Sequence, residues 1–181
     1  MPLSFSLEDV VYRPLSDQCP RGGFRCTEED LNQWFYKDAC KRHEAYTCRV
    51  VTAHLGDAAE PIGFYAMGIM LESDRLLKGT GPIRNRAMGG VYPVLHLEYL
   101  AVDERYVGNR LGPDMLSRAL VTFTQSVIEI GVPVMTLVPL RDRLVKFYSD
   151  RGFVPYGQHR GEKRMMLTAA MAMKAYEAAL N

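Results

Sequence analysis

Apolar residues recur at helical spacing in the first quarter of the chain. They are Leu31, Trp34, Phe35 and Ala39. Residues three or four positions apart share one face of an α-helix, so this pattern predicts an amphipathic helix over residues 28–42. Thr27 stands where an N-cap is expected, and Asp30 three residues later completes a shortened capping box.

Other segments concentrate β-branched and aromatic residues over the length of a strand, which is typical of β-structure. They are Val10–Arg13, Thr47–Leu55, Pro61–Leu71, Val94–Val102, Val132–Leu140 and Arg164–Thr168. Gly56 and Asp57 separate the second segment from the third and predict an antiparallel hairpin. The fourth segment, VLHLEYLAV, is the strongest strand pattern in the chain.

Three further helices are expected in the second half of the chain. Pro113 can open the first, because the missing N–H of proline is not needed at the first helical position. One face of that helix is apolar and consists of Met115, Leu116, Ala119, Leu120, Phe123, Val127 and Ile130. Leu144–Arg151 predicts a short helix ended by Gly152, and Ala169–Leu180 predicts a C-terminal helix.

Residues 73–92 show no periodicity and predict a long loop, which in a compact domain is usually functional or mobile. The loop carries the basic residues Arg75, Lys78, Arg84 and Arg86. Such a loop can meet tRNA phosphates or an acidic substrate. An ordinary solvated loop is the alternative.

The order of these elements predicts an α/β (α+β) fold, with helices around a mixed central sheet. The chain has 181 residues, enough for one well-cored domain and too few for two of ordinary size. We therefore expect a single domain over residues 1–181.

Charge and composition exclude several classes of protein. The net charge is +1, so no overall field draws the chain to nucleic acid or anionic lipid. Apolar runs fall short of the ~20 residues of a membrane span, and the N-terminus lacks a signal pattern. The four cysteines have irregular spacings that suit neither zinc nor a disulfide framework. We expect a cytoplasmic chain without a metal site or membrane partner.

Residues 100–116, LAVDERYVGNRLGPDML, combine a strand, a glycine-bearing loop and a helix. Backbone N–H groups in such a turn point the same way, and the helix dipole adds partial positive charge at its N-terminus. The arrangement suits a pyrophosphate. On Gly108 and Gly112 alone, a plain strand-to-helix turn explains the pattern equally well.

The segment L-A-V-D, followed by a glycine loop and an apolar helix, resembles motif A of the GNAT superfamily of N-acetyltransferases. Val145–Tyr148 with Gly152 and Phe153 is similar to the family's F-Y-x-x-x-G-F element, at the family's spacing. Phe24–Ala39 resembles the first helix of one branch, the toxin-type enzymes of bacterial toxin–antitoxin pairs, which acetylate aminoacyl-tRNA. The resemblance covers residues 10–168 and implies a GNAT fold with a mixed sheet of six to seven strands.

The resemblance also implies acetyl-CoA as co-substrate and places it on one continuous segment. Its cofactor-binding residues would be Leu100, Ala101, Val102, Val107, Gly108, Asn109, Arg110, Leu111, Gly112 and Pro113.

This segment departs from the family pattern Q/R-x-x-G-x-G/A at three positions. Val107 replaces the first polar residue, Arg110 replaces the middle glycine, and Pro113 removes a backbone N–H that could donate to phosphate. A positive φ at Arg110 would cost roughly 1 kcal/mol. The guanidinium could instead supplement the pyrophosphate site, because arginine suits phosphate geometry. Tyr99 stands where the toxin branch usually has an arginine.

Amide formation from a thioester needs a base for the ammonium and an acid for the departing thiolate. The resemblance makes Tyr148 the candidate acid, with a packed core tyrosine as the alternative. His96 and Glu98 alternate on the strand and share a face with Leu100, and the family often takes its base from these positions. The alternative is an outer edge of the sheet or a structural hydrogen bond between the two.

Several acceptors stay open: the amine of aminoacyl-tRNA, a protein amine, or a small polyamine-like amine. A non-catalytic CoA-binding module is a further alternative, favoured by Val107, Arg110 and Pro113. A homodimer and an antitoxin partner are also consistent with the resemblance. No G-x-S-x-G motif or cysteine nucleophile turn supports hydrolase or thiolase chemistry.

Overall fold

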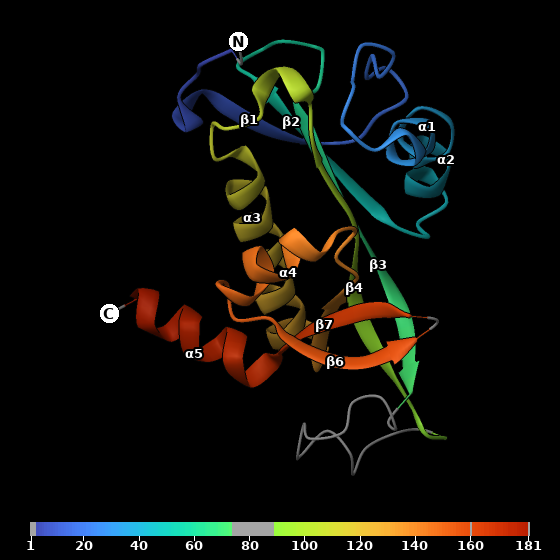
Figure 1. Ribbon diagram of the computed structural model, residues 1–181, viewed down its shortest axis with the longest axis vertical. Helices are drawn as coiled ribbons and strands as arrows, with labels where there is room; N and C mark the ends of the chain where they lie inside the picture. Colours follow the sequence, from blue (N-terminus) through green and yellow to red (C-terminus); the bar gives the residue numbers. More distant parts are fainter. Residues whose placement is uncertain (1–2, 74–88, 160, 181) are drawn as a thin grey trace. The chain divides into compact units, whose positions relative to one another are not determined.

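A computed structural model describes residues 3–73, 89–159 and 161–180. In these residues seven strands form a mixed sheet in the order β1-β2-β3-β4-β5-β7-β6. The strands and helices, all but β5 labelled in Figure 1, are β1 (Val10–Pro14), α1 (Glu29–Lys37), α2 (Ala39–Glu44), β2 (Arg49–Leu55), β3 (Gly63–Ser73), β4 (Val91–Val102), α3 (Leu111–Ile130), β5 (Val134–Leu137), α4 (Asp142–Ser149), β6 (Val154–His159), β7 (Glu162–Thr168) and α5 (Ala169–Leu180). The mixed sheet and its helices confirm the predicted fold class.

The chain divides into two compact units. The first contains Met1–Gly68 and Glu98–Ala119, and the second contains Ile69–Leu97 and Leu120–Asn181. The single domain predicted over residues 1–181 stays a prediction.

An aromatic core holds the first unit together. The predicted hairpin is confirmed, because β2 pairs antiparallel with β3, and β1 pairs antiparallel with β2. On α1, Phe35 stacks against Phe64 of β3 at a centroid distance of 4.0 Å. Phe24 meets both rings edge-on, at 5.1 and 5.3 Å. Burial of a phenylalanine contributes about 1.5–3 kcal/mol, so these rings fix α1 on the sheet.

The helix predicted over residues 28–42 is two helices, α1 and α2, which meet at Asp38. Asp38 has φ −117°, outside the helical range, and aspartate is a poor residue for a helix interior. The break gives α2 its own direction. Ala39 and His43 are buried on it, and Arg42 extends toward β4.

The N-cap prediction for Thr27 was wrong. Glu28 precedes α1, and the Thr27 hydroxyl donates to the Glu28 carboxylate at 3.4 Å. The Asn32 side chain holds the start of the helix instead, through the backbone of Cys26. Its amide oxygen accepts from the Cys26 N–H at 2.8 Å, and its amide nitrogen donates to the Cys26 carbonyl at 3.0 Å.

In the second unit, β4 pairs parallel with β5, and β7 pairs antiparallel with both β5 and β6. β6 was not predicted from the sequence, because Pro155 and Gly157 weaken its strand pattern. The strand tolerates them because β6 is at the edge of the sheet and has an irregular register between Pro155 and Gln158. β5 is shorter than predicted, since Pro133 and Pro139 bracket it.

The helix α3 begins at Leu111, two residues before the predicted start, so Pro113 is its third residue. The predicted strands Val10–Arg13 and Val94–Val102 and the helix Ala169–Leu180 are confirmed. The basic loop predicted over residues 73–92 falls mostly on residues 74–88, which lie outside the described residues.

Candidate functional site

The segment between β4 and α3 in the first unit has the geometry of an anion-binding loop. Gly108 has φ 98° and Arg110 has φ 60°, so two left-handed residues turn the chain just before the helix. Asp114 is the first residue after Gly108 whose N–H has a backbone acceptor among the described residues, the Arg110 carbonyl at 3.1 Å. The preceding N–H groups therefore stay available to a ligand at the positive end of α3.

The predicted cofactor residues have different surroundings within this loop. Val107 is 51% exposed, whereas Ala101 and Leu111 are buried. The Arg110 side chain is exposed and forms no ion pair with the described residues. A Cβ on Gly112 would lie 3.8 Å from Val102, an ordinary contact, so packing does not require glycine there.

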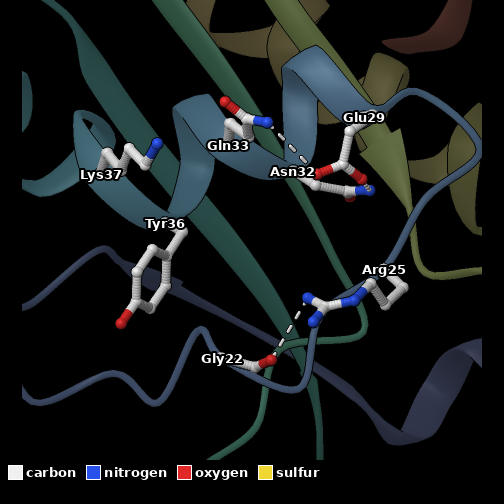
Figure 2. A pocket seen from close by; sticks show the side chains of 7 residues that line it. All are labelled: Gly22, Arg25, Glu29, Asn32, Gln33, Tyr36 and Lys37. Carbon is white, nitrogen blue, oxygen red and sulfur yellow. Dashed lines mark hydrogen bonds between the residues drawn. The ribbon is translucent and has the colours of Figure 1, made fainter.

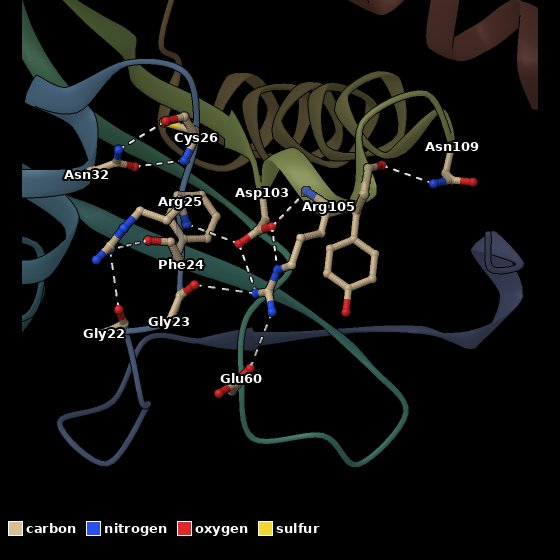
Figure 3. A network of polar contacts seen from close by, with 11 residues as sticks. Gly22, Gly23, Phe24, Arg25, Cys26, Asn32, Glu60, Asp103, Arg105 and Asn109 are labelled. Carbon is tan, nitrogen blue, oxygen red and sulfur yellow. Dashed lines mark hydrogen bonds and ion pairs between the residues drawn. The ribbon is translucent and has the colours of Figure 1, made fainter. Parts of the chain in front are cut away.

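A buried carboxylate anchors the start of this loop (Figure 3). Asp103 is fully buried and accepts hydrogen bonds from the Arg25 N–H at 3.0 Å, the Arg105 N–H at 3.0 Å, and the Arg105 guanidinium at 2.8 and 3.0 Å. Burial alone would raise the pKa of Asp103, but these donors outweigh it and lower the pKa. The carboxylate is ionised at neutral pH and joins the turn after β4 to the segment before α1.

Asn109 extends this anchoring to the other side of the loop. Its amide nitrogen donates to the Leu3 carbonyl at 2.7 Å and to the Tyr106 carbonyl at 3.1 Å. The Asn109 side chain therefore supports the loop from within, and the contribution of Asn109 to a ligand would come from its backbone.

Glu98 lies at the centre of a second cluster in the first unit. The Arg42 guanidinium donates two hydrogen bonds to the Glu98 carboxylate, at 2.5 and 3.0 Å. The Glu98 side chain is 16% exposed. A Cβ on Gly68 would lie 2.5 Å from this carboxylate, so a larger residue there would displace the end of the Glu98 side chain. Glu98 therefore forms an ion pair with Arg42, and the hydrogen bond between His96 and Glu98 considered from the sequence stays a prediction.

Aromatic side chains line the same cluster. Trp34 lies 4.2 Å from Tyr99 and 5.9 Å from Phe64 between ring centroids. The Arg42 guanidinium lies 6.0 Å from the Trp34 ring. Trp34 and Tyr99 are half-buried. Burial, followed by the charge of Glu98, raises the pKa of Tyr99, so its hydroxyl is protonated at neutral pH.

The second unit contains the other two candidate catalytic residues. Tyr148 is 8% exposed and packs edge-on against Phe147 at 5.0 Å and Phe153 at 5.8 Å. Burial raises the pKa of Tyr148 to about 12, and the charge of Arg151 opposes this shift. Within the described residues its hydroxyl has no hydrogen-bond partner. His96 shares a hydrogen bond of 2.9 Å, through Nδ1, with the buried Thr136 hydroxyl.

A pocket of about 370 Å³ lies on the outer side of α1 (Figure 2). It is lined by Gly22, Arg25, Glu29, Asn32, Gln33, Tyr36 and Lys37. Much of its polar lining is already satisfied internally: Arg25 donates to the Gly22 carbonyl at 3.3 Å, and Glu29 accepts from Asn32 at 3.2 Å. None of the predicted catalytic or cofactor residues lines it.

Sequence reasoning missed three residues that shape these clusters: Arg42, Gly68 and Asp103. The D of L-A-V-D was a visible signal for Asp103, whereas nothing local marks Arg42 or Gly68. Among the described residues no group of histidine, cysteine and carboxylate side chains could hold a metal ion. No helix in the described part of the chain is long and apolar enough to cross a membrane.

The seven-stranded mixed sheet and the loop between β4 and α3 define a GNAT fold, as the sequence resemblance implied. The predicted likeness to its toxin-type branch is confirmed. No family model matches the chain. The chain is 29% identical over 145 residues to a probable toxin, TacT, of Sinorhizobium fredii, across 75% of this chain and 78% of TacT.

Solved structures of toxins share the fold. AtaT in complex with acetyl-methionyl-tRNAfMet is 18% identical with a TM-score of 0.81, and the match covers 96% of this chain and all of AtaT. A KacT variant with tyrosine replaced by phenylalanine is 16% identical with a TM-score of 0.81, covering 92% and 99%. AtaTR bound with acetyl-CoA is 17% identical with a TM-score of 0.76, covering 94% and 99%.

Proposed function

We propose that this chain is an N-acetyltransferase that moves the acetyl group of acetyl-CoA to the α-amine of an aminoacyl-tRNA. The observation that carries the proposal is the loop before α3, with two left-handed residues and unpaired N–H groups, in a GNAT fold. The AtaT complex with acetyl-methionyl-tRNAfMet supports the choice of acceptor.

The first unit supplies the groups that would hold acetyl-CoA. The N–H groups of residues 108–112 and the Arg110 guanidinium would bind the pyrophosphate. In the described residues the β4–β5 pairing covers Leu95–Leu97. The backbone of residues 100–102 beyond it can therefore pair with the amides of the pantetheine arm. Asp103 keeps the turn between these two parts in place.

The reaction joins the amine nitrogen to the carbonyl carbon of the thioester and breaks the C–S bond. The nitrogen loses one proton to a base or to water, and the departing thiolate takes one proton. Tyr148 is the proposed acid, because its pKa of about 12 keeps the hydroxyl protonated and this hydroxyl donates no hydrogen bond to a described residue. His96 and Glu98 stay the candidate bases.

The ordinary pKa of the acceptor bears on which amine can react. An α-amine, with an ordinary pKa of about 7.7–8.0, is partly neutral at physiological pH, whereas a lysine amine at about 10.4 is not. The α-amine of an aminoacyl ester therefore reacts with less help from a base than a lysine or polyamine amine needs.

Labelled acetyl-CoA incubated in parallel with aminoacyl-tRNA, whole-cell protein and polyamines tests the acceptor. Label on the aminoacyl-tRNA is expected, and Tyr148→Phe should lower kcat by roughly 10²-fold with little change in acetyl-CoA affinity. Expression in bacteria should slow growth, and the Tyr148→Phe form should be harmless. Label on protein or polyamine alone would reject the tRNA acceptor and keep the acetyltransferase activity.

Binding of acetyl-CoA can be tested apart from turnover. The ligand should raise the Tm of the wild type, because it binds only the folded state. Gly112→Asp should abolish this shift, and Gly112→Asn is its uncharged control. A Cβ at this position meets only ordinary contacts and the two side chains have nearly the same shape, so a difference between them reports charge near the pyrophosphate. No shift of the wild-type Tm at millimolar acetyl-CoA would reject the proposed co-substrate.

The class of relatives also suggests partners. One AtaT structure contains the C-terminus of the antitoxin AtaR, and we propose an antitoxin partner for this chain. Co-purification with the product of a neighbouring gene tests it. A homodimer and a cytoplasmic location are further proposals, which sedimentation and cell fractionation can check.

A further inference from the structure

The turn between α2 and β2 exposes an aromatic side chain that the fold does not use. Tyr46 is 82% exposed, the largest exposed fraction among the large hydrophobic side chains described. Its φ is 57°, in the left-handed region that disfavours a residue with a Cβ. A strained backbone under a solvent-exposed ring contributes nothing to the core, and such strain often marks a functional position.

A cation accompanies the ring. The Arg49 guanidinium lies 5.5 Å from the centroid of Tyr46, within the range of a cation–π contact. Arg49 is exposed and forms no ion pair within the described residues, and Lys41 on the preceding helix is exposed as well. The turn therefore presents an aromatic face and unneutralised positive charge together.

Backbone contacts connect this turn to the cluster around Glu98. The Arg42 carbonyl accepts hydrogen bonds from the N–H groups of Thr47 at 3.1 Å and Cys48 at 3.4 Å, and from the Thr47 hydroxyl at 3.2 Å. The guanidinium of the same Arg42 holds Glu98. The Thr47 carbonyl lies 3.2 Å from the Cβ position of Gly68, which the Glu98 carboxylate also approaches. Tyr46 and Arg49 are thus on the turn that connects to the cluster around Glu98.

We propose that Tyr46 and Arg49 form a platform for the unpaired 3′ end of the acceptor RNA, an inference that rests on the proposed function. A nucleobase stacks on the exposed ring, and Arg49 neutralises an adjacent phosphate. The aminoacyl group attached to that end then reaches the cluster of Glu98, Trp34 and Tyr99. An exposed ring with an unpaired arginine fits a single-stranded RNA, which offers both π-faces and phosphates.

Steady-state kinetics on two acceptors that share one amine test the platform: an aminoacyl-tRNA and the methyl ester of the same amino acid. Tyr46→Asn removes the ring and keeps a residue that tolerates a left-handed backbone. It should raise the KM for the aminoacyl-tRNA about 5-fold or more and leave the KM for the ester unchanged. Tyr46→Phe, which keeps the ring, should behave as the wild type.

Arg49 gives an independent readout. Arg49→Ala should reduce the slope of log KM for the aminoacyl-tRNA against log salt concentration by about 1, the value expected for one phosphate contact. Arg49→Lys should preserve the slope. An unchanged KM in Tyr46→Asn, or equal increases for both acceptors, would overturn the platform.

The proposed function is judged separately, by whether the wild type acetylates aminoacyl-tRNA at all. If it does not, fluorescence anisotropy with labelled uncharged tRNA decides the platform. Weaker binding by Tyr46→Asn than by Tyr46→Phe supports it. Equal binding overturns it.

Discussion

Arg110 has a backbone conformation that suits glycine, so Arg110→Gly separates the role of the side chain in the fold from its role with the ligand. A left-handed conformation costs a non-glycine residue about 1–2 kcal/mol, and Arg110 has φ 60°. Glycine also lowers the free energy of unfolding by about 0.4–1 kcal/mol, because it gives the unfolded chain more conformational freedom. The free energy of unfolding should rise by about 0.5 kcal/mol, a Tm increase of roughly 1–2 °C.

Affinity for acetyl-CoA should change in the opposite direction. The exposed Arg110 guanidinium has no ion-pair partner in the described residues, so it is free to bind phosphate. A hydrogen bond to a charged group contributes about 1.5–3 kcal/mol, and its loss should raise the Kd at least about tenfold. The difference should shrink at high ionic strength, because salt screens an exposed charge.

Thermal unfolding without ligand and calorimetric titration with acetyl-CoA, at low and high salt, measure the two effects. Arg110→Asn tolerates the left-handed backbone without the charge and should match glycine in affinity. Arg110→Lys keeps the charge and should be intermediate. Wild-type affinity in Arg110→Gly would refute the role of the guanidinium, and a lower free energy of unfolding would refute the strain.

Three further predictions concern the first unit. Asp103→Asn should lower the free energy of unfolding in urea titrations by about 3 kcal/mol, because it leaves the arginine partner of a buried pair unmatched. It should also raise the KM for acetyl-CoA, and an unchanged KM would show that Asp103 does not position the loop. Phe35→Ala should cost about 3–5 kcal/mol of unfolding free energy, and a loss below about 1 kcal/mol would contradict the aromatic core. Burial, followed in each case by a nearby arginine charge, lowers the pKa values of His43 and His54. The unfolded chain therefore binds protons first, and the free energy of unfolding should fall as pH drops below about 6.5. His43→Asn should flatten that dependence, and an identical pH profile would exclude His43 as its source.

Local patterns in the sequence determined the secondary structure that carries the site. The alternation in VLHLEYLAV predicted the strand β4, and the glycine-bearing loop with the apolar face after it predicted α3. Alignment of that loop with the family pattern also identified Arg110 as the residue in a glycine position, and its φ of 60° agrees. These features depend on residues within a few positions of each other, so periodicity and turn chemistry are sufficient to find them.

Only the tertiary structure decided how the candidate base is held. Arg42 and Glu98 are 56 residues apart, and the Glu98 carboxylate lies 2.5 Å from the Cβ position of Gly68. No local pattern records these contacts, because they depend on how separate elements pack. The sequence by itself therefore determined the fold class and the glycine-bearing loop before α3. The tertiary structure decided that Glu98 is ion-paired and that Tyr46 is exposed, since ion pairing and exposure arise only when distant segments meet.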